Sequence, residues 1–192
     1  MTLNKSFPAV CPYVRMADSL HYTHMELRQT LAARRLLDYQ LFFVRGGHGE
    51  IRLRNESIAF KGNTLCFMQP GIVHAYAFAN CRVHYIHFDL FFHPYRLSVP
   101  IIPGGRTEWS AHEKSMAQPS LNDLLNFNLP MAIRIDDADA VENALKSAVD
   151  IFMRAQMMHQ LRLQGITAEL VGRFLDTSLP MRTPTDISTD ER

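Results

Sequence analysis

Three cysteines, one tryptophan and no long apolar run are what this 192-residue chain has least of. Cys11, Cys66 and Cys81 form no CxxC pair and are odd in number, so we expect reduced thiols and no disulfide framework. The N-terminal segment MTLNKSFPAVCPYVRM lacks the apolar stretch of a signal peptide. No segment reaches the roughly 18–20 apolar residues of a membrane-spanning helix. We therefore expect a cytoplasmic protein with no membrane partner.

An excess of charge of either sign is also missing. Twenty Lys and Arg residues face nineteen Asp and Glu residues, which leaves a formal net charge of +1. A surface that tracks nucleic acid needs a clustered basic stripe, and the only adjacent basic pair here is Arg34–Arg35. The nucleophile-elbow, P-loop and dinucleotide-binding glycine motifs are absent as well. We expect neither direct DNA binding by this chain nor catalysis of those types.

Residues 34–92 have the pattern of successive short β-strands. Between Glu50 and Arg54 apolar and polar side chains alternate with a period of two. Turn signals such as Gly46–Gly47 and Lys61–Gly62–Asn63 recur at intervals of about eight to twelve residues, which is typical of a sandwich or barrel. The predicted strands cover residues 36–45, 50–54, 57–60, 64–68, 74–79 and 82–91.

The rest of the chain divides into four segments. Residues 1–33 have the character of an irregular leader or arm, which could fold over the barrel. Residues 93–136 contain five prolines, so we expect an irregular continuation of the barrel with one short helix at 120–127, capped by Ser120. Apolar residues with helical spacing in 137–177 predict two helices, the second from about Met157. Residues 178–192 are polar and are expected to form a linker or tail.

A stripe of small and apolar residues marks the second helix. Its members are Leu161, Gly165, Ala168, Gly172 and Leu175. Their spacing of four, three, four and three is that of a coiled-coil stripe, and each interior glycine costs about 1 kcal/mol relative to alanine. That cost is easier to understand if another helix approaches closely. Three alternatives stay open: packing against the first helix, a seam between two copies of the chain, or a break at Gly165 with a new helix capped by Thr167.

The most informative stretch surrounds a Pro-Gly turn. Pro70–Gly71–Ile–Val–His74–Ala–Tyr76 follows one predicted strand and leads to a second that ends in His87–Phe–Asp89. In this order, after a strand that ends at Arg45–Gly–Gly, the segments resemble the N-terminal domain of AraC-family transcription regulators. The resemblance covers residues 34–177. It implies a mainly β fold, a cupin-type double-stranded β-helix (jelly-roll barrel) followed by a C-terminal antiparallel pair of α-helices.

The same resemblance implies a set of ligand-binding residues. They are Arg45, His74, Tyr76, Tyr85, Val83 and Phe43. Arg45 corresponds to an arginine that contacts ligand oxygens in sugar-sensing relatives, and its fixed donors suit hydroxyls or a carboxylate. His74 and Tyr76 match a pocket-lining pair and share one strand face, because positions i and i+2 do. Val83 replaces what can be a polar residue, which predicts a pocket less hydrophilic than a pentose site.

Each of these positions also has a purely structural interpretation. Arg45 could form an ion pair at the barrel rim, and His74 could hold the turn. Tyr76 and Tyr85 could be core aromatics whose hydroxyls find partners inside the fold. We expect His87 to be structural rather than in contact with ligand.

The function implied is that of a small-molecule-sensing and dimerisation domain. An effector, either a sugar or a small organic acid, would bind in the barrel, and the C-terminal helices would form a homodimer. DNA would be bound only through a helix-turn-helix domain that is not in this chain. No cofactor, metal or catalytic residue is expected.

Two alternatives belong to other functional classes. One is a metal-dependent cupin enzyme, whose metal is held by three His and one Glu. The strand 39–45 contains no His or acid, and His84 and His87, three positions apart, should point to opposite faces of their strand. The other is a standalone binding module that dimerises with a regulator and blocks it.

Overall fold

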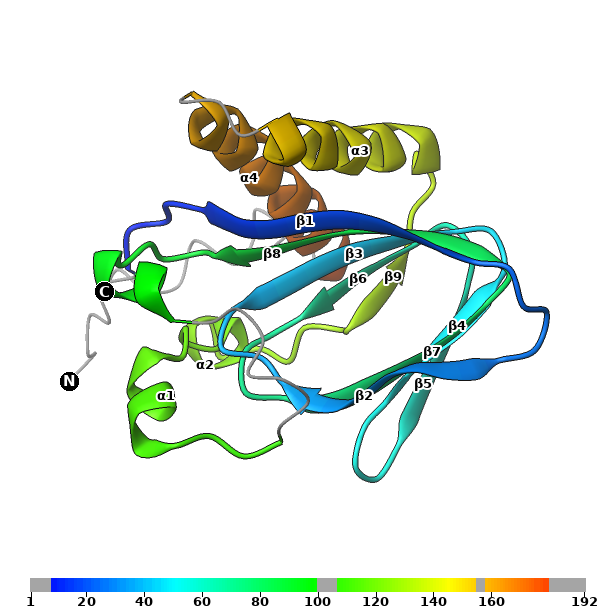
Figure 1. Ribbon diagram of the computed structural model, residues 1–192, viewed down its shortest axis with the longest axis horizontal. Coiled ribbons are helices and arrows are strands. Elements are labelled where there is room, and N and C mark those ends of the chain that lie inside the picture. Colours follow the sequence, from blue (N-terminus) through cyan, green and yellow to red (C-terminus); the bar gives the residue numbers. More distant parts are fainter. Residues whose placement is uncertain (1–7, 100–106, 155–157, 180–192) are drawn as a thin grey trace, which may run out of the picture.

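Two antiparallel β-sheets face each other, and two helices cover the outer face of the first (Figure 1). The computed structural model describes residues 8–99, 107–154 and 158–179. The first sheet has the order β1 (Tyr13–Tyr22), β8 (Cys81–Asp89), β3 (Tyr39–Arg45), β6 (Thr64–Met68) and β9 (Ala132–Arg134). The second has the order β2 (Arg28–Arg35), β7 (Val73–Ala79), β4 (His48–Arg52) and β5 (Ser57–Lys61). Strands that alternate between two sheets in this way form a jelly roll, which confirms the predicted cupin-type barrel.

Two of the turns predicted from glycine show why the sequence places them correctly. Gly46 and Gly47 connect β3 to β4 with φ angles of 71° and 55°, a backbone region that glycine enters without steric cost. Gly71, with φ of 84°, follows Pro70 at the β6–β7 connection, and its N–H donates to the Leu36 carbonyl at 3.0 Å. The strand assignments within 36–91 are thus correct to within a few residues.

Strands β1 and β2 correct the prediction of an irregular leader. β1 pairs with β8 along its whole length, and β2 pairs with β7, so both strands are integral to the barrel. Their pattern is hard to detect because each lies at the edge of its sheet and both pairings contain register shifts. An interrupted register breaks the alternation that identifies a strand. The barrel therefore begins at Tyr13, about twenty residues before the predicted boundary.

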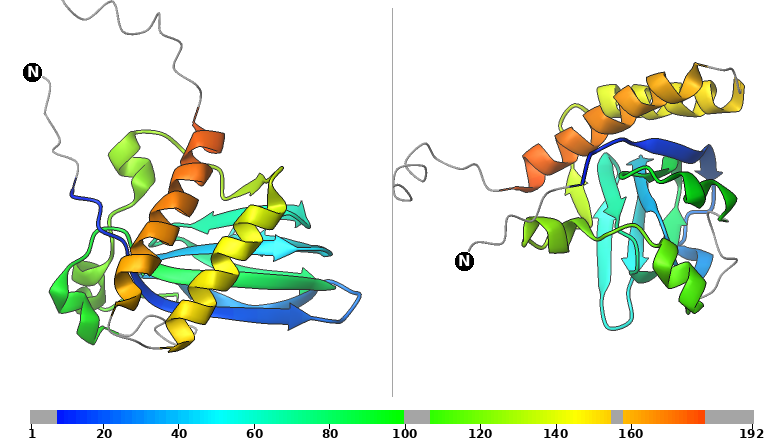
Figure 2. Two further views of the ribbon diagram at one scale, coloured as in Figure 1. Left: turned by 90° about the horizontal axis from the view of Figure 1, so that it is seen from above. Right: turned by 90° about the vertical axis from the view of Figure 1, so that its left-hand side faces the viewer.

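Two C-terminal helices, α3 (Ala138–Arg154) and α4 (His159–Ser178), lie across the outer face of the first sheet (Figure 2). Asp137 caps α3, since its carboxylate accepts a hydrogen bond from the Ala140 N–H at 3.3 Å. Helix α4 continues through Gly165 without a break, which excludes a separate helix starting after that residue. The predicted start at Met157, like most of the 178–192 tail, lies outside the described residues.

Short helices close one end of the barrel: η1 (Pro94–Ser98), α1 (Ala111–Met116) and α2 (Leu121–Leu125). The helix predicted at 120–127 is therefore present but shorter. Ser120 precedes it as expected, yet its hydroxyl makes no cap. Instead the Gln69 side-chain oxygen accepts hydrogen bonds from both the Asn122 N–H and the Ser120 hydroxyl, each at 3.1 Å.

The apolar core has two layers on either side of the first sheet. One layer lies between this sheet and the helices and includes Leu41, Phe43 and Phe174. The other fills the barrel between the two sheets and includes Phe42 and Phe78. Within the part of the chain that the structure describes, no helix is long and apolar enough to cross a membrane.

The turn between β3 and β4 yields a test of the fold. A Cβ atom on Gly47 would lie 2.2 Å from the Ala79 carbonyl oxygen, whereas one on Gly46 would have its nearest neighbour, the Asn80 oxygen, at 3.9 Å. Gly46→Ala should cost about 1 kcal/mol of unfolding free energy for its positive φ alone. Gly47→Ala should cost at least about 2 kcal/mol more, because backbone must move. Urea denaturation of both variants measures the difference, and equal losses would contradict this account of the turn.

Candidate functional site

A cavity of about 130 Å³ lies inside the barrel. Its walls come from both sheets: Leu20, Tyr22, Leu31, Arg34, Gln40, Phe42, Tyr76, Phe78, Val83, Tyr85 and His87. The half-buried members, Leu20, Tyr22 and Leu31, belong to the edge strands β1 and β2, and the others are buried. The cavity therefore communicates with solvent between those two edges. Of the six predicted ligand-binding residues, Tyr76, Tyr85 and Val83 line it.

Side-chain alternation along β3 decides which of its residues reach the cavity. Tyr39, Leu41 and Phe43 pack towards the helices, whereas Gln40 and Phe42 line the cavity. Phe43, predicted as a ligand contact, is thus on the opposite face of its strand. Both faces of β3 are covered, so the strand is apolar throughout and its sequence gives no sign of which face is inside.

Arg45 shares the outward face of β3 and lies outside the cavity. Its guanidinium forms ion pairs with two carboxylates of α3, at 2.7 Å to Asp139 and 3.3 Å to Glu142. It also donates a hydrogen bond to the Asn63 side-chain oxygen at 3.3 Å. These contacts match the alternative interpretation of Arg45 as a residue of a barrel-rim ion pair.

Glu142 is the centre of that ionic cluster. It is buried, and besides Arg45 it lies 3.4 Å from Arg82, 3.5 Å from His84 and 2.9 Å from Lys146. Burial opposes its ionisation, but the surrounding positive charges, with Lys146 foremost, hold the pKa of Glu142 below its usual value. The cluster ties α3 to β3 and β8. His84 and His87 point to opposite faces of β8, as the spacing predicts.

Arg34 of β2 is the arginine that the structure places in the cavity. Its side chain is buried, with a guanidinium carbon 5.5 Å from the centre of the Tyr76 ring. One nitrogen lies 3.5 Å from the Gln40 side-chain oxygen, which also accepts a hydrogen bond from the Tyr76 hydroxyl at 2.8 Å. Its Nε atom is buried and has no hydrogen-bond partner among the described residues. The Arg34–Arg35 pair was the only signal in the sequence, and it does not indicate which of the two faces inward.

His74 lies beside this arginine without lining the cavity itself. The residues are paired across β2 and β7, and the His74 ring lies 4.9 Å from that of Tyr76. Its Nδ1–H donates to the Ile72 carbonyl at 2.9 Å, which fixes the ring at the end of the Pro-Gly turn. Burial, aided by the charge of Arg34, lowers the pKa of His74 to about 4. The imidazole is therefore neutral at pH 7, and its buried Nε2 is an acceptor.

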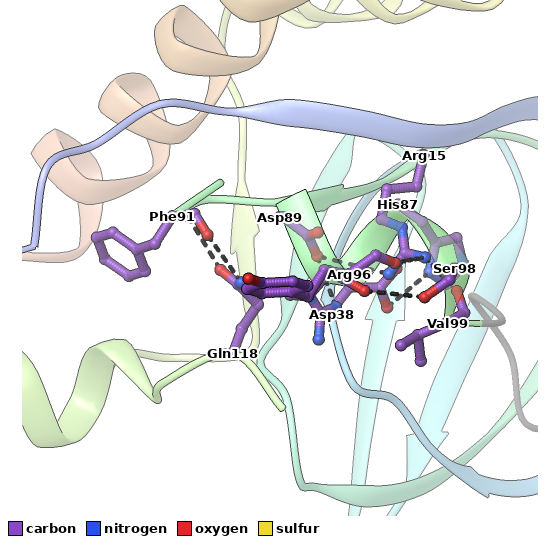
Figure 3. Close-up of polar contacts among 10 residues, drawn as sticks. Arg15, Asp38, His87, Asp89, Phe91, Arg96, Ser98, Val99 and Gln118 are labelled. Carbon is purple, nitrogen blue, oxygen red and sulfur yellow. Dashed lines mark hydrogen bonds and ion pairs between the residues drawn. The ribbon is translucent and has the colours of Figure 1, made fainter. Parts of the chain in front are cut away.

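His87 connects the cavity to a buried polar cluster at the closed end of the barrel (Figure 3). Its Nδ1 lies 3.4 Å from a carboxylate oxygen of Asp38, which is fully buried. Nearby, Asp89 accepts a hydrogen bond from Arg96 at 2.6 Å, and Arg15 lies 3.8 Å from the same oxygen. The sequence favours a structural role for His87, yet its ring also forms part of the cavity wall.

Two tyrosine hydroxyls of the cavity, those of Tyr76 and Tyr85, remain protonated at physiological pH. Burial raises the pKa of Tyr85 to about 12, with a smaller contribution from the negative charge of Asp18. Burial likewise raises the pKa of Tyr76 well above its usual value. Both side chains can therefore donate hydrogen bonds. Across the described ranges, no group of three or more His, Cys, Asp or Glu side chains could hold a metal ion.

Most of the predicted seam of α4 faces away from the barrel, but Leu175 is half-buried and packs against the core. Leu161 is 64% exposed, and a Cβ atom built on Gly165 or Gly172 would have no neighbour within 4 Å. Helix α4 packs on the fold through its opposite side, with Leu163, Leu170 and Phe174 buried. Close approach of α3 is therefore not the reason for the two glycines.

A family model and two solved structures are similar to this chain. Residues 18–124, more than half of the chain, match the family model described as AraC-like ligand binding domain. ToxT from Vibrio cholerae O395 aligns with a TM-score of 0.43 at 10% identity, covering 90% of this chain and 58% of that one. The epimerase RmlC from Mycobacterium tuberculosis aligns with a TM-score of 0.29 at 17% identity, covering 59% and 69%. A search of curated proteins finds no match. The chain thus spans less than two thirds of that ToxT chain.

The pKa of His74 generates a prediction about stability. In the unfolded chain this residue takes up a proton below about pH 6.5, whereas in the fold it does so only near pH 4. The unfolded state therefore binds more protons between these values, and stability must fall as the pH drops through them, by up to about 3 kcal/mol. Urea denaturation from pH 7 to pH 4 should show a shallower decline for His74→Gln than for the native protein. Identical slopes would contradict the assigned neutral state.

Proposed function

Because the chain belongs to the family of AraC-like ligand-binding domains, we propose that it is the effector-sensing and dimerisation domain of a cytoplasmic AraC-type transcription regulator. A small molecule, a sugar or a small organic acid, binds in the barrel cavity. Its binding controls a DNA-binding domain that is attached to this domain or belongs to a partner. The observation that carries the proposal is the cavity itself, which is walled by apolar and aromatic side chains with a few polar groups.

One of the two strands at the cavity mouth, β1, also contacts both C-terminal helices. On β1, Leu20 and Tyr22 line the cavity, while the Val14 backbone exchanges two hydrogen bonds with Gln160 of α4, at 2.9 and 3.3 Å. The Ser19 hydroxyl bonds to His84 at 2.7 Å, next to Glu142 of α3. A ligand that draws β1 towards β2 therefore changes the surface on which both helices rest. Such a ligand shifts the domain between two states by its differential affinity for them.

The outward stripe of α4 supplies the dimer contact in this proposal. Its two glycines would let the backbone of a second helix approach closely, and the exposed side chain of Leu161 would be covered. Because α4 packs directly on β1, a movement of β1 caused by a ligand in the cavity also moves the helix that carries the seam. Dimerisation and effector sensing are thereby coupled.

Blocking the cavity tests the sensing role. Val83 is buried in the cavity wall, so Val83→Phe should fill the space and remove the thermal stabilisation that any effector gives. A panel of sugars and organic acids is first screened on the native protein by thermal shift. Leu20→Trp, at the half-buried mouth, provides a second blocked variant should the first fold poorly.

The matched control for the blocked variants is Arg45→Ala. Arg45 lies outside the cavity, so this variant should keep the full ligand-induced shift relative to its own unliganded melting temperature. Loss of the shift in Arg45→Ala together with its retention in Val83→Phe would refute the assigned site.

The dimer seam is tested by replacing a small residue at its centre with a large charged one. Gly165 has open space around it, so Gly165→Arg should leave the monomer intact, yet put a large charged side chain at the centre of the seam. Sedimentation velocity should show a native dimer and a monomeric variant, with Arg162→Ala, on the flank of α4, still dimeric. A native protein that stays monomeric at micromolar concentrations would contradict the dimer.

A further inference from the structure

We infer that the effector of this cavity is a compact organic carboxylate, held through its charged group by Arg34 and through its apolar body by the aromatic walls. This inference rests on the proposed function and narrows its two effector classes to one. Its starting point is the positive charge of Arg34, which is buried in the barrel without an ion-pair partner among the described residues.

The Arg34 side chain is buried without a counter-ion. Only 7% of the residue is exposed, and it forms no ion pair with any carboxylate in the part of the chain that the structure describes. Its guanidinium lies over the Tyr76 ring and makes a long contact to the neutral oxygen of Gln40, while its Nε has no acceptor among the described residues. A buried, unpaired guanidinium is costly, so a group of opposite charge is needed to complete the site.

The acidic residues nearby do not fill this role. None of the residues that line the cavity is Asp or Glu. Asp38 faces His87 instead, with one carboxylate oxygen 3.4 Å from the ring Nδ1. Asp18 of β1 contributes to the raised pKa of Tyr85, and it accepts a hydrogen bond from the Ser19 N–H at 2.7 Å. The neighbouring His74 is neutral, because burial keeps its pKa low.

The polar groups around Arg34 suit a carboxylate. A planar guanidinium binds a carboxylate through two parallel hydrogen bonds, and such charge-assisted bonds are about twice as strong as neutral ones. The Tyr85 hydroxyl, whose pKa burial raises further above neutrality, can donate an additional bond. Each of these groups lies in the cavity wall.

Size and polarity restrict the remainder of the ligand. A cavity of about 150 Å³ in another protein holds one benzene molecule, so about 130 Å³ encloses at most a small ring or a short chain and excludes a long acyl chain. The remaining walls are apolar or aromatic: Leu20, Leu31, Phe42, Phe78 and Val83. A sugar would bring several hydroxyl groups against these apolar walls and would leave the charge of Arg34 unbalanced.

Matched acids and amides test the inference by isothermal titration calorimetry. The probes are benzoate and hexanoate, with benzamide and hexanamide as neutral analogues of the same shape. The native protein should bind at least one acid at least tenfold more tightly than its amide. Arg34→Gln should lose that preference and bind the acid at least tenfold more weakly.

Arg35→Gln is the control, since Arg35 follows directly in the chain but stacks on Trp109 outside the cavity, at 5.3 Å from its ring centre. It should bind the acids as the native protein does. Equal affinity of the native protein for acid and amide, unchanged acid binding by Arg34→Gln, or no binding of either acid would overturn the inference. Binding of a sugar that is abolished by Val83→Phe, without acid binding, would overturn it while leaving the sensing role intact. No binding of any probe or panel compound would overturn both.

Discussion

The burial of the first sheet on both faces is the constraint on which the rest of the structure depends. Residues of β3 and β8 alternate between a layer that supports α3 and α4 and a layer that forms the barrel interior. One strand therefore serves two surfaces: Tyr85 faces the cavity, and its neighbour His84 faces the helices through Glu142. A change in side-chain packing on one face of such a strand is felt on the other, because packed interiors are nearly incompressible. This arrangement can couple a ligand to the helices without a hinge.

The sequence is enough to predict the barrel, its turns and the helical pair, because these depend on local signals. Glycines at positive φ, period-two alternation in the exposed strands and the helical apolar stripe are all local features. What the sequence does not reveal is which face of each strand points into the cavity. The side chains of β3 are mostly apolar on both faces. Which face of this strand lines the cavity, that of Gln40 and Phe42 or that of Phe43 and Arg45, therefore depends on where the helices pack. Cross-strand pairing settles it, since Phe42 lies opposite Tyr85 and Gln40 opposite His87.

The same reasoning explains why the sequence points to Arg45, whereas the arginine that lines the cavity is Arg34. Arg45 follows an obvious strand and a glycine turn, whereas Arg34 lies on β2, whose register is interrupted and whose sequence resembles a polar leader. Only the closure of the second sheet on the first brings Arg34 next to Gln40 and Tyr76. The stripe of small and apolar residues on α4, by contrast, is predicted by the spacing of these residues in the sequence. The fold adds that it faces outward, where a second chain could reach it.

The central claim is that the charge of Arg34 is completed by an anionic ligand inside the barrel, and nuclear magnetic resonance measures this most directly. In protein with ¹⁵N-labelled arginine, the Nε–H resonance of Arg34, assigned by its loss in Arg34→Gln, is followed during titration with benzoate and with hexanoate. The account predicts a marked downfield proton shift and slower exchange with water for a bound acid, because the unpartnered Nε–H of Arg34 gains a charged acceptor. A resonance that stays unchanged at saturating concentrations of both acids would contradict it.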